Sequence, residues 1–398
     1  MSLSPSLVNA NTHPLVVGKL ASPAAIHIVL LVLSFLLLLL GAEIFTNGVE
    51  WLGHRLGVSE SATGSILAAV GTALPETMIP VIAILQATFG SGAQAAADEV
   101  GVGAILGAPF MLSTIAMFLV GASVLYFGDR RSFGEQMHFN EVSTQRDLSF
   151  FLMGYTLAFA AAVIHDELVG YAIGAVLVAL YLVYLVRSLQ SGELVESDDL
   201  EELHLGQAVE GASNRLLDGE SGPHADDPHV SLVVLQTLGA LAVIIAGAHM
   251  FVGQTTWVSD EILHMPAAVI ALLIAPLATE LPEKLNSVIW ISRDKDTLAL
   301  GNISGAMAFQ GTLPVTLGIL FTSWNLSLAW GTTGFLNAFS AILAIVSGGI
   351  LYLRARNVDE GNMSPYPFLI GGVFYTLFIA VLLYHVFVIG VAAGGAGH

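Results

Sequence analysis

Long apolar segments follow one another along most of this chain. A helix needs about 20 apolar residues to cross a bilayer, and ten segments come near that length. They cover approximately residues 24–46, 61–86, 100–127, 149–164, 168–187, 231–252, 266–291, 298–321, 329–353 and 368–392. The pattern predicts an all-α membrane protein with ten transmembrane helices, of which the fourth is short.

The composition supports a membrane protein and excludes several other classes. Hydrophobic residues make up 55% of the chain and charged residues only 11%, against about 25% charged in a soluble domain. A net charge of −19 would repel a polyanion, so no nucleic-acid partner is expected. The chain has no cysteine, which excludes thiolate metal sites and disulfides. The expected surroundings are a lipid bilayer, and the oligomeric state stays open.

The basic residues lie almost entirely in the connections that follow the odd-numbered segments. Ten of the 12 lysines and arginines are there, and the opposite side has only Lys19, because Lys284 lies inside a segment. Basic residues mark the cytoplasmic side of a membrane. The bias predicts both termini outside, the odd connections in the cytoplasm, and a prokaryotic plasma membrane. One of those connections, 188–230, is strongly acidic, and it is either a regulatory cation-binding loop or a solvated connector.

Three pairs of segments match in the same order along the chain, which indicates a duplication. Residues 71–76 (Gly-Thr-Ala-Leu-Pro-Glu) align with 278–283 (Ala-Thr-Glu-Leu-Pro-Glu) at an offset of 207. The glycine motif 103–107 aligns with 301–305, and 41–43 with 247–249. Each half has five predicted helices, so the second copy enters the membrane from the opposite side. Such inverted-topology repeats are common in secondary transporters.

The repeat divides the chain into five regions. These are an N-terminal tail (1–23), a first repeat (24–187), the acidic cytoplasmic loop (188–230), a second repeat (231–392) and a C-terminal tail (393–398).

The first Pro-Glu motif places a carboxylate inside a predicted span. An isolated acid there costs about 2.5–3.5 kcal/mol on insertion scales, so Glu76 needs compensation. Pro75 has no N–H, which frees the carbonyl of Gly71 one turn earlier. Thr72 lies four residues before Glu76 and shares its helix face. A carboxylate, a hydroxyl and a loose carbonyl are hard oxygen ligands of the kind that bind Na⁺ or Ca²⁺.

The second motif repeats this set with Thr279, Glu283 and the carbonyl of Ala278, which Pro282 frees. Two carboxylates balance one divalent ion, and they could instead be protonated, which would allow proton exchange. The simpler alternative at each motif is a kinked helix with a structural acid.

Other polar residues within the segments have two interpretations each. Gln310 and Asn302 are candidate ligands or interhelical hydrogen-bonding groups. Glu43 and His249 occupy equivalent positions in the repeats. They are candidate coupling residues, or else interfacial or hydrogen-bonded groups. The glycines of the third and eighth segments are expected to allow close helix packing.

These residues and their spacing resemble the calcium/cation antiporter superfamily, in particular its sodium/calcium exchanger branch. The resemblance rests on 71–76, 278–283 and 301–305. It implies alternating-access exchange of a cation such as Ca²⁺ against Na⁺ or H⁺. It also implies that Glu76 and Glu283 are the central ligands, with Thr72 and Thr279 helping, and that the first and sixth helices slide across the other eight.

The chain departs from that family around the second motif. Glu280 stands where the family usually has serine, and the first-repeat equivalent is Ala73. Lys284 lies four residues after Glu280, a spacing at which the two can pair on a helix. The pair then supplies a fixed cation where relatives bind an ion, acts as a proton-coupled switch, or is a plain structural ion pair. These departures favour H⁺ slightly over Na⁺ as the counter-ion.

The sequence therefore predicts a secondary active cation antiporter that needs no cofactor and carries Ca²⁺, Na⁺ or H⁺. A passive cation channel and a non-transporting scaffold or sensor are the alternatives. An enzyme is not expected, because the chain has no metalloprotease, nucleophile-elbow or phosphate-loop motif.

Overall fold

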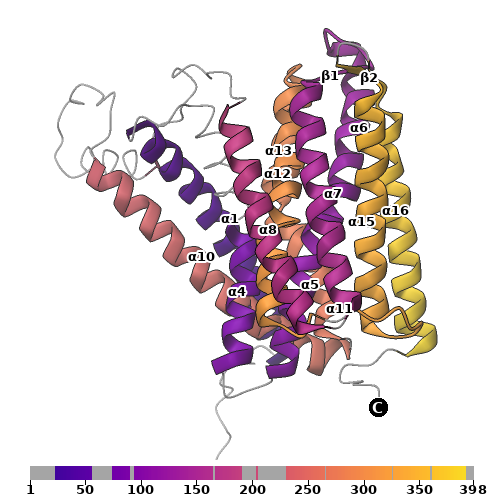
Figure 1. The fold of residues 1–398 in the computed structure, drawn as a ribbon. Helices are drawn as coiled ribbons and strands as arrows, with labels where there is room; N and C mark the ends of the chain where they lie inside the picture. Colours follow the sequence, from indigo (N-terminus) through magenta and orange to yellow (C-terminus); the bar gives the residue numbers. More distant parts are fainter. Residues whose placement is uncertain are drawn as a thin grey trace, which may run out of the picture.

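The computed structural model describes residues 23–55, 74–89, 94–164, 166–190, 203–204, 230–264, 266–324, 326–358 and 361–390. These residues form an elongated bundle of helices (Figure 1). The predicted tails and the acidic connection 188–230 lie almost wholly outside the described residues.

The described elements are nearly all helical. In the first half they are α1 (Pro23–Arg55), α4 (Leu74–Phe89), α5 (Gln94–Met111), the π-helix η2 (Leu112–Ala116), α6 (Met117–Phe127), the 3₁₀ turn η3 (Gly128–Arg130), β1 (Met137–His138), α7 (Glu141–Ile164) and α8 (Glu167–Gln190). In the second half they are α10 (Val230–Val258), the π-helix η5 (Ser259–Leu263), α11 (Ala267–Thr279), α12 (Leu281–Ser292), α13 (Asp296–Gln310), α14 (Leu313–Phe321), α15 (Thr333–Arg356), β2 (Asn362–Met363), α16 (Tyr366–Tyr384) and the π-helix η6 (His385–Ile389).

Eight helical runs among the described residues are long and apolar enough to cross a membrane. They are Ala24–Phe45, Ala97–Arg130, Glu141–Ile164, Glu167–Ser188, Val230–Leu263, Asp296–Phe321, Thr333–Arg356 and Tyr366–Ile389. An integral membrane protein built of helices is therefore confirmed. The other two predicted spans, 61–86 and 266–291, contain shorter helices, namely α4 of 16 residues and α11 and α12 of 13 and 12.

The fourth predicted span is longer than expected. The hydrophobic pattern starts it at residue 149, but α7 begins at Glu141 and has 24 residues. Its first turns contain polar residues that are nevertheless buried, such as Thr144 and Asp147. Hydrophobicity alone hides such turns, because their polar groups are satisfied by neighbouring helices.

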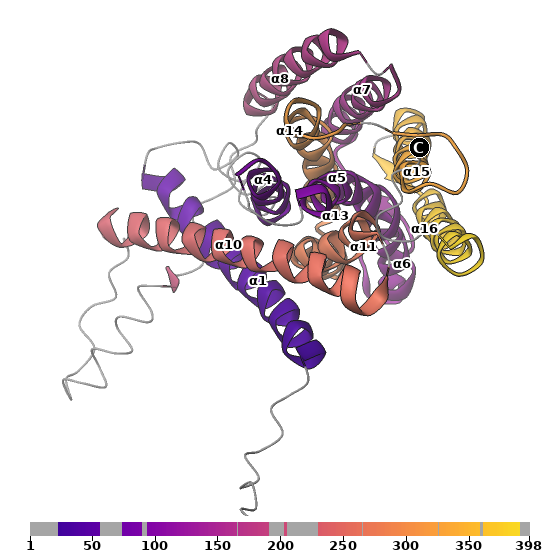
Figure 2. The same ribbon diagram turned by 90° about the horizontal axis from the view of Figure 1, so that it is seen from below.

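Helices α1 and α10 pack against each other and slant across one side of the bundle (Figures 1 and 2). Small residues make this crossing close. A Cβ atom added to Gly41 would lie 2.8 Å from Ile244, and one added to Gly247 would lie 3.2 Å from Leu38. Close backbone approach at small residues is the usual way in which helices associate in lipid.

Helix α5 lies inside the bundle, where it packs against α4, α11 and α15 (Figure 2). The end of α5 passes through η2 directly into α6, and the matching run of the second half, α13 and α14, is interrupted at Gly311 and Thr312. Both halves thus depart from regular α-helix at corresponding places.

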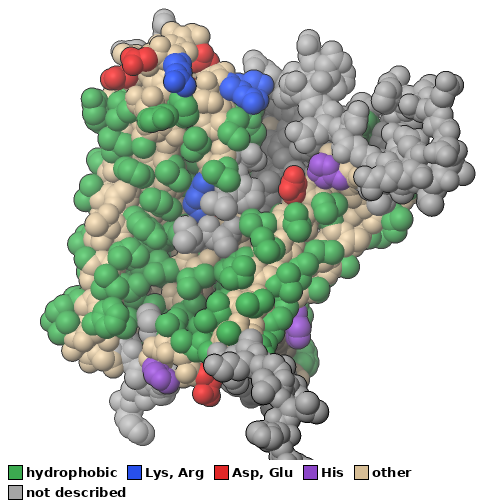
Figure 3. All heavy atoms as spheres, turned by 180° about the vertical axis from the view of Figure 1, so that it is seen from behind, with side chains coloured by type: hydrophobic (Ala, Val, Ile, Leu, Met, Phe, Trp, Pro, Cys, Tyr) green, Lys and Arg blue, Asp and Glu red, His purple; other side chains and the backbone are tan. Residues whose placement is uncertain are grey.

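One end of the bundle carries a small polar cap. Strands β1 and β2 form an antiparallel pair, with Met137 opposite Met363 and His138 opposite Asn362. The connections α6–α7, α12–α13 and α15–α16 meet there, which agrees with the prediction that these odd-numbered connections share one side. Most of the face in Figure 3 is apolar, and most of its charged side chains lie near this upper end. The sequence pattern does not reveal the strands, which are two residues long each.

The glycine motifs pack closely in one half only. A Cβ atom added to Gly107 of α5 would collide with the carbonyl of Leu272 and lie 2.8 Å from Pro276, both on α11. The corresponding glycine of α13, Gly305, has only the Tyr184 hydroxyl, at 3.5 Å, and no described atom comes within 4 Å at Gly301. The expectation of close packing is confirmed at Gly107, and the described residues give no equally close contact at Gly301 or Gly305.

Gly107→Ala should therefore destabilise the protein, whereas Gly305→Ala should not. Added atoms in a well-packed position cost about 1–3 kcal/mol, and at Gly107 the opposing atom belongs to the backbone and cannot rotate away. We expect a lower thermal unfolding temperature for purified Gly107→Ala in detergent. Equal temperatures for the two variants would contradict the close α5–α11 contact.

Candidate cation site

The second Pro-Glu motif lies at a break between two helices. Helix α11 ends at Thr279 and α12 begins at Leu281, with Glu280 between them at φ −86° and ψ 7°. The hydrophobic pattern predicts one continuous span over 266–291, and this is wrong in detail, because the structure divides that span into two helices. The reason is local: Pro282 has no N–H to donate to the carbonyl of Ala278, and its ring crowds that carbonyl, so the helix is interrupted and a new one starts with proline in its first turn.

Glu280 and Lys284 form a buried ion pair beside this break. Lys284 Nζ lies 3.0 Å from Glu280 Oε2 and donates a second hydrogen bond, of 3.2 Å, to the carbonyl of Pro276 on α11. The side chains are 1% and 3% exposed, respectively. The predicted pairing is thus confirmed, and the lysine does not snorkel to the membrane surface.

The two predicted central carboxylates occupy the same position in two helices. Helix α4 begins at Leu74 and α12 at Leu281, so Glu76 and Glu283 are each the third residue of a helix that opens Leu-Pro-Glu. A helix N-terminus carries a partial positive charge that favours an ionised acid in the first turn. The side-chain positions of Glu76 and Glu283, together with Gly71 and Thr72, lie outside the described residues.

Two further predicted ligands of the second repeat belong to α11. Thr279 is its last residue and its side chain is buried, and Ala278 precedes it. The last carbonyl groups of a helix have no intrahelical partner, and Pro282 supplies no N–H to the carbonyl of Ala278. Because the break separates Thr279 from Glu283, the two lie on different helices, and the predicted shared helix face does not apply to them.

Gln310 and Asn302 lie on α13, in different environments. Gln310 ends the helix and is 2% exposed, and no described residue donates a hydrogen bond to its Oε1. Asn302 is only half-buried. Gln310 is therefore the stronger ligand candidate of the two.

Asp147 is a buried acid that the sequence analysis missed. It lies on α7, accepts a 2.9 Å hydrogen bond from Ser304 of α13, and forms a 3.0 Å ion pair with the adjacent Arg146. It escaped notice because residues 141–148 read as a polar connection. The available signal was an acid two residues before a long apolar run, next to its own counter-ion.

Glu43 and His249 do not lie together. Both side chains are exposed, on α1 and α10 respectively. His249 Nδ1 is 3.0 Å from Gln86 Nε2 on α4, which agrees with a hydrogen-bonding role. This contact joins a slanting helix to the helix that carries Glu76.

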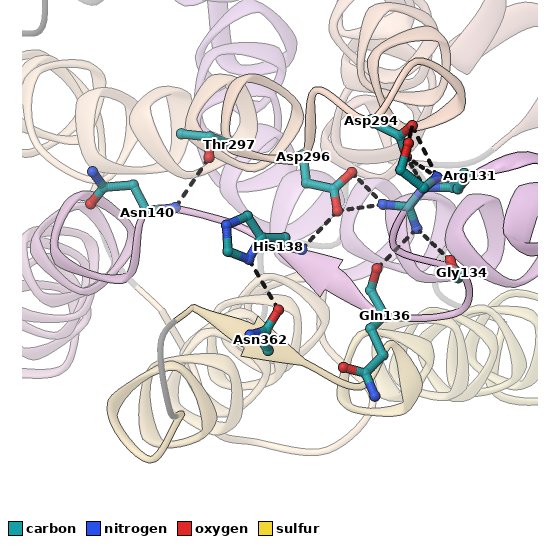
Figure 4. Close-up of polar contacts among 10 residues, drawn as sticks. Arg131, Gly134, Gln136, His138, Asn140, Asp294, Asp296, Thr297 and Asn362 are labelled. Carbon is teal, nitrogen blue, oxygen red and sulfur yellow. Dashed lines mark hydrogen bonds and ion pairs between the residues drawn. The ribbon is translucent and has the colours of Figure 1, made fainter.

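A separate charged cluster joins the connections at the polar cap (Figure 4). Arg131 makes a bidentate contact with Asp296 at the start of α13, and the backbone N–H of His138 donates to the same carboxylate at 2.8 Å. Asp294 lies 3.5 Å from Arg131 and accepts a 2.7 Å hydrogen bond from the Ser132 hydroxyl. That hydrogen bond lowers the pKa of Asp294. These acids are neutralised by protein groups, so the cluster holds connections together and is not a second cation site.

Comparison with known proteins agrees with this architecture. A family model described as sodium/calcium exchanger protein matches two segments, residues 26–190 and 232–387. A putative antiporter, CaxA, of Alkalimonas amylolytica is 22% identical over 332 residues, which cover 83% of this chain and 92% of the relative. An uncharacterized membrane protein of Methanocaldococcus jannaschii is 23% identical over 348 residues, 85% of this chain and 92% of the relative.

Solved exchanger structures share the fold. The crystal structure of the H⁺/Ca²⁺ exchanger CAX aligns with a TM-score of 0.63 and 17% identity, covering 90% of this chain and 82% of that one. The sodium-calcium exchanger NCX_Mj, soaked with Na⁺ and Sr²⁺, aligns with a TM-score of 0.53 and 18% identity, covering 89% and 98%.

The cluster at the polar cap predicts a large difference between two adjacent arginines. Arg131→Ala leaves the buried carboxylate of Asp296 without its counter-ion, which typically costs 3–5 kcal/mol (an order-of-magnitude estimate). Arg130 is exposed, so Arg130→Ala should change stability by no more than about 0.5 kcal/mol. Thermal unfolding of the two purified variants tests this prediction. Similar losses of stability in both variants would contradict the proposed role of Arg131 in the charged cluster at the polar cap.

Proposed function

Because this chain belongs to the sodium/calcium exchanger protein family, we propose that it is a secondary active antiporter that carries Ca²⁺ or another cation against H⁺ or Na⁺. The proteins that it resembles are transporters rather than enzymes. The observation that carries the proposal is the matched start of α4 and α12, where Leu-Pro-Glu puts one carboxylate into the first turn of each helix.

Ten transmembrane helices in two inverted five-helix repeats are part of this proposal. The packing of the described helices supports it, because contacts recur when the halves are exchanged. Helix α7 packs against α13 as α15 packs against α5, α8 packs against α14 as α16 packs against α6, and α7–α8 corresponds to α15–α16. The two separate matches to one family model support it as well.

The proposed cation site lies where the two Leu-Pro-Glu turns meet. Glu76 and Glu283 supply the charge that balances a divalent cation, and Thr72, Thr279 and the carbonyl oxygens of Gly71 and Ala278 complete an oxygen shell. Oxygen ligands of this type suit Ca²⁺ and Na⁺ rather than softer metals. Glu280, at the break, and Gln310, at the end of α13, add buried oxygen groups. The cation is cargo, so no resident cofactor is required.

The counter-ion is H⁺ or Na⁺. One structural neighbour is named for H⁺ and the other for Na⁺, and carboxylates can bind either. In the proposed cycle α1 and α10 move across the other helices, and Glu43, His249, Lys284 and Asn302 are candidate coupling residues. The hydrogen bond between His249 and Gln86 joins α10 to α4, so a change in this hydrogen bond would indicate that movement.

The proposed orientation follows the basic residues. Both termini are outside a prokaryotic plasma membrane, and the polar cap with β1 and β2 faces the cytoplasm.

Transport by purified protein in liposomes tests the proposal. Ca²⁺ uptake is measured with an outward H⁺ gradient, an outward Na⁺ gradient and no gradient. We expect uptake with one of the two gradients and background uptake without any. Glu76→Gln and Glu283→Gln should each reduce uptake to background, because either loss removes half of the charge that balances Ca²⁺. Glu167→Gln, an exposed acid on α8, is the matched control and should transport normally.

Each other outcome has a definite meaning. Equal uptake with and without gradients would indicate a passive channel. Binding of Ca²⁺ without flux would indicate a scaffold or sensor, and full activity of both Gln variants would disprove the proposed site.

A further inference from the structure

The environment of Lys284 is that of a bound ion. Its ammonium nitrogen contacts a carboxylate oxygen of Glu280 at 3.0 Å and the main-chain carbonyl of Pro276 at 3.2 Å. Both contacts lie at the C-terminal end of α11, and both side chains are almost completely buried. In transporters with broken helices, carbonyl groups at such helix ends and nearby carboxylates coordinate monovalent cations.

We propose that Lys284 is a tethered cation, whose ammonium fills the place of one monovalent cation at the end of α11. The inference rests on the proposed antiporter function and refines its cation site. Glu280 then binds a cation that never leaves the protein. The two charges of Glu76 and Glu283 remain for the cargo, and the exchanger binds one Na⁺ fewer than the same scaffold would without the lysine.

The repeat argues that the pair is not needed to start a helix at Leu-Pro-Glu. At the offset of 207, the first-half equivalents of Glu280 and Lys284 are Ala73 and Thr77. Helix α4 nevertheless begins with the same Leu-Pro-Glu turn. A helix with the Leu-Pro-Glu start thus forms in one half without any such pair, so the pair is not required for that turn.

The energetics of a buried pair agree with a functional role. Replacing a buried ion pair with apolar residues is often neutral or stabilising, whereas removal of one partner leaves an uncompensated charge. The pair is thus a poor device for stability alone. A buried Glu280 without Lys284 would require another cation, and Na⁺ is small enough to bind between the same two oxygens.

The test is the number of Na⁺ ions bound per chain, measured with radioactive ²²Na⁺ on purified protein at one pH with choline replacing Na⁺. Lys284→Leu should bind one Na⁺ more than the wild type. Lys284→Arg keeps the charge and should match the wild type. The double variant Glu280→Gln with Lys284→Leu removes both charges and should also lack the extra ion.

Stability provides a second measurement if Lys284→Leu folds poorly. Its thermal unfolding temperature should rise in NaCl relative to choline chloride by several degrees more than that of the wild type or of the double variant. An unfolding temperature or a folded yield of Lys284→Leu that is equally low in both salts would overturn the proposal. An extra Na⁺ in the double variant would overturn it as well, because that ion would not be bound by Glu280.

The result is separable from the antiporter proposal. Ca²⁺ uptake that depends on Glu76 and Glu283, together with no extra Na⁺ in Lys284→Leu, would reject the tethered cation alone. An extra Na⁺ in Lys284→Leu without any Ca²⁺ exchange would reject Ca²⁺ as the cargo and leave the tethered cation standing.

Discussion

A break in a helix inside a membrane has to be satisfied by the protein itself, because the hydrocarbon offers no water to the exposed backbone groups. The interruption between α11 and α12 meets this requirement with few atoms. The Pro276 carbonyl accepts hydrogen bonds from both the Glu280 backbone N–H and the Lys284 ammonium, and the Glu280 carbonyl accepts from the Lys284 backbone N–H. The close contact of Gly107 with the same turn of α11 holds α5 against it. The position of the first turn of α12, and of Glu283 within it, depends on these contacts.

Much of this arrangement follows from the sequence, because membranes impose simple rules. Apolar length predicts the spans, and the pairing of Glu280 with Lys284 follows from their spacing. The duplicated Leu-Pro-Glu motif predicts that two helices each carry a carboxylate at the corresponding position. What the pattern could not supply was whether proline would bend a helix or divide it, since that depends on the hydrogen bonds available nearby. It also could not reveal the hydrogen bond between Asp147 and Ser304 or the contact of Arg131 with Asp296, because each joins residues that lie far apart in the chain.

The two halves resemble each other in their contacts but differ in their chemistry. The first half has Ala73, Thr77 and a glycine packed tightly at 107, and the second has Glu280, Lys284 and a looser glycine at 305. A duplicated scaffold that needs only its general packing to fold can accept such differences at individual positions. If the two Leu-Pro-Glu turns form one site as proposed, asymmetry of this kind gives its two sides different affinities, which a symmetric pair of helices could not provide.

The polar cap has a consequence for the energetics of any transport cycle. It joins one connection of the first half to two of the second, through Arg131, Asp296 and the β1–β2 pair, and neither α1 nor α10 contributes a residue to the contacts described there. If α1 and α10 are the moving parts, these charged contacts persist unchanged in every conformation. They therefore add the same free energy to the inward-facing and outward-facing states. Such a cap raises the resistance of the whole protein to unfolding while leaving the conformational equilibrium, and hence the direction and rate of exchange, to be set elsewhere.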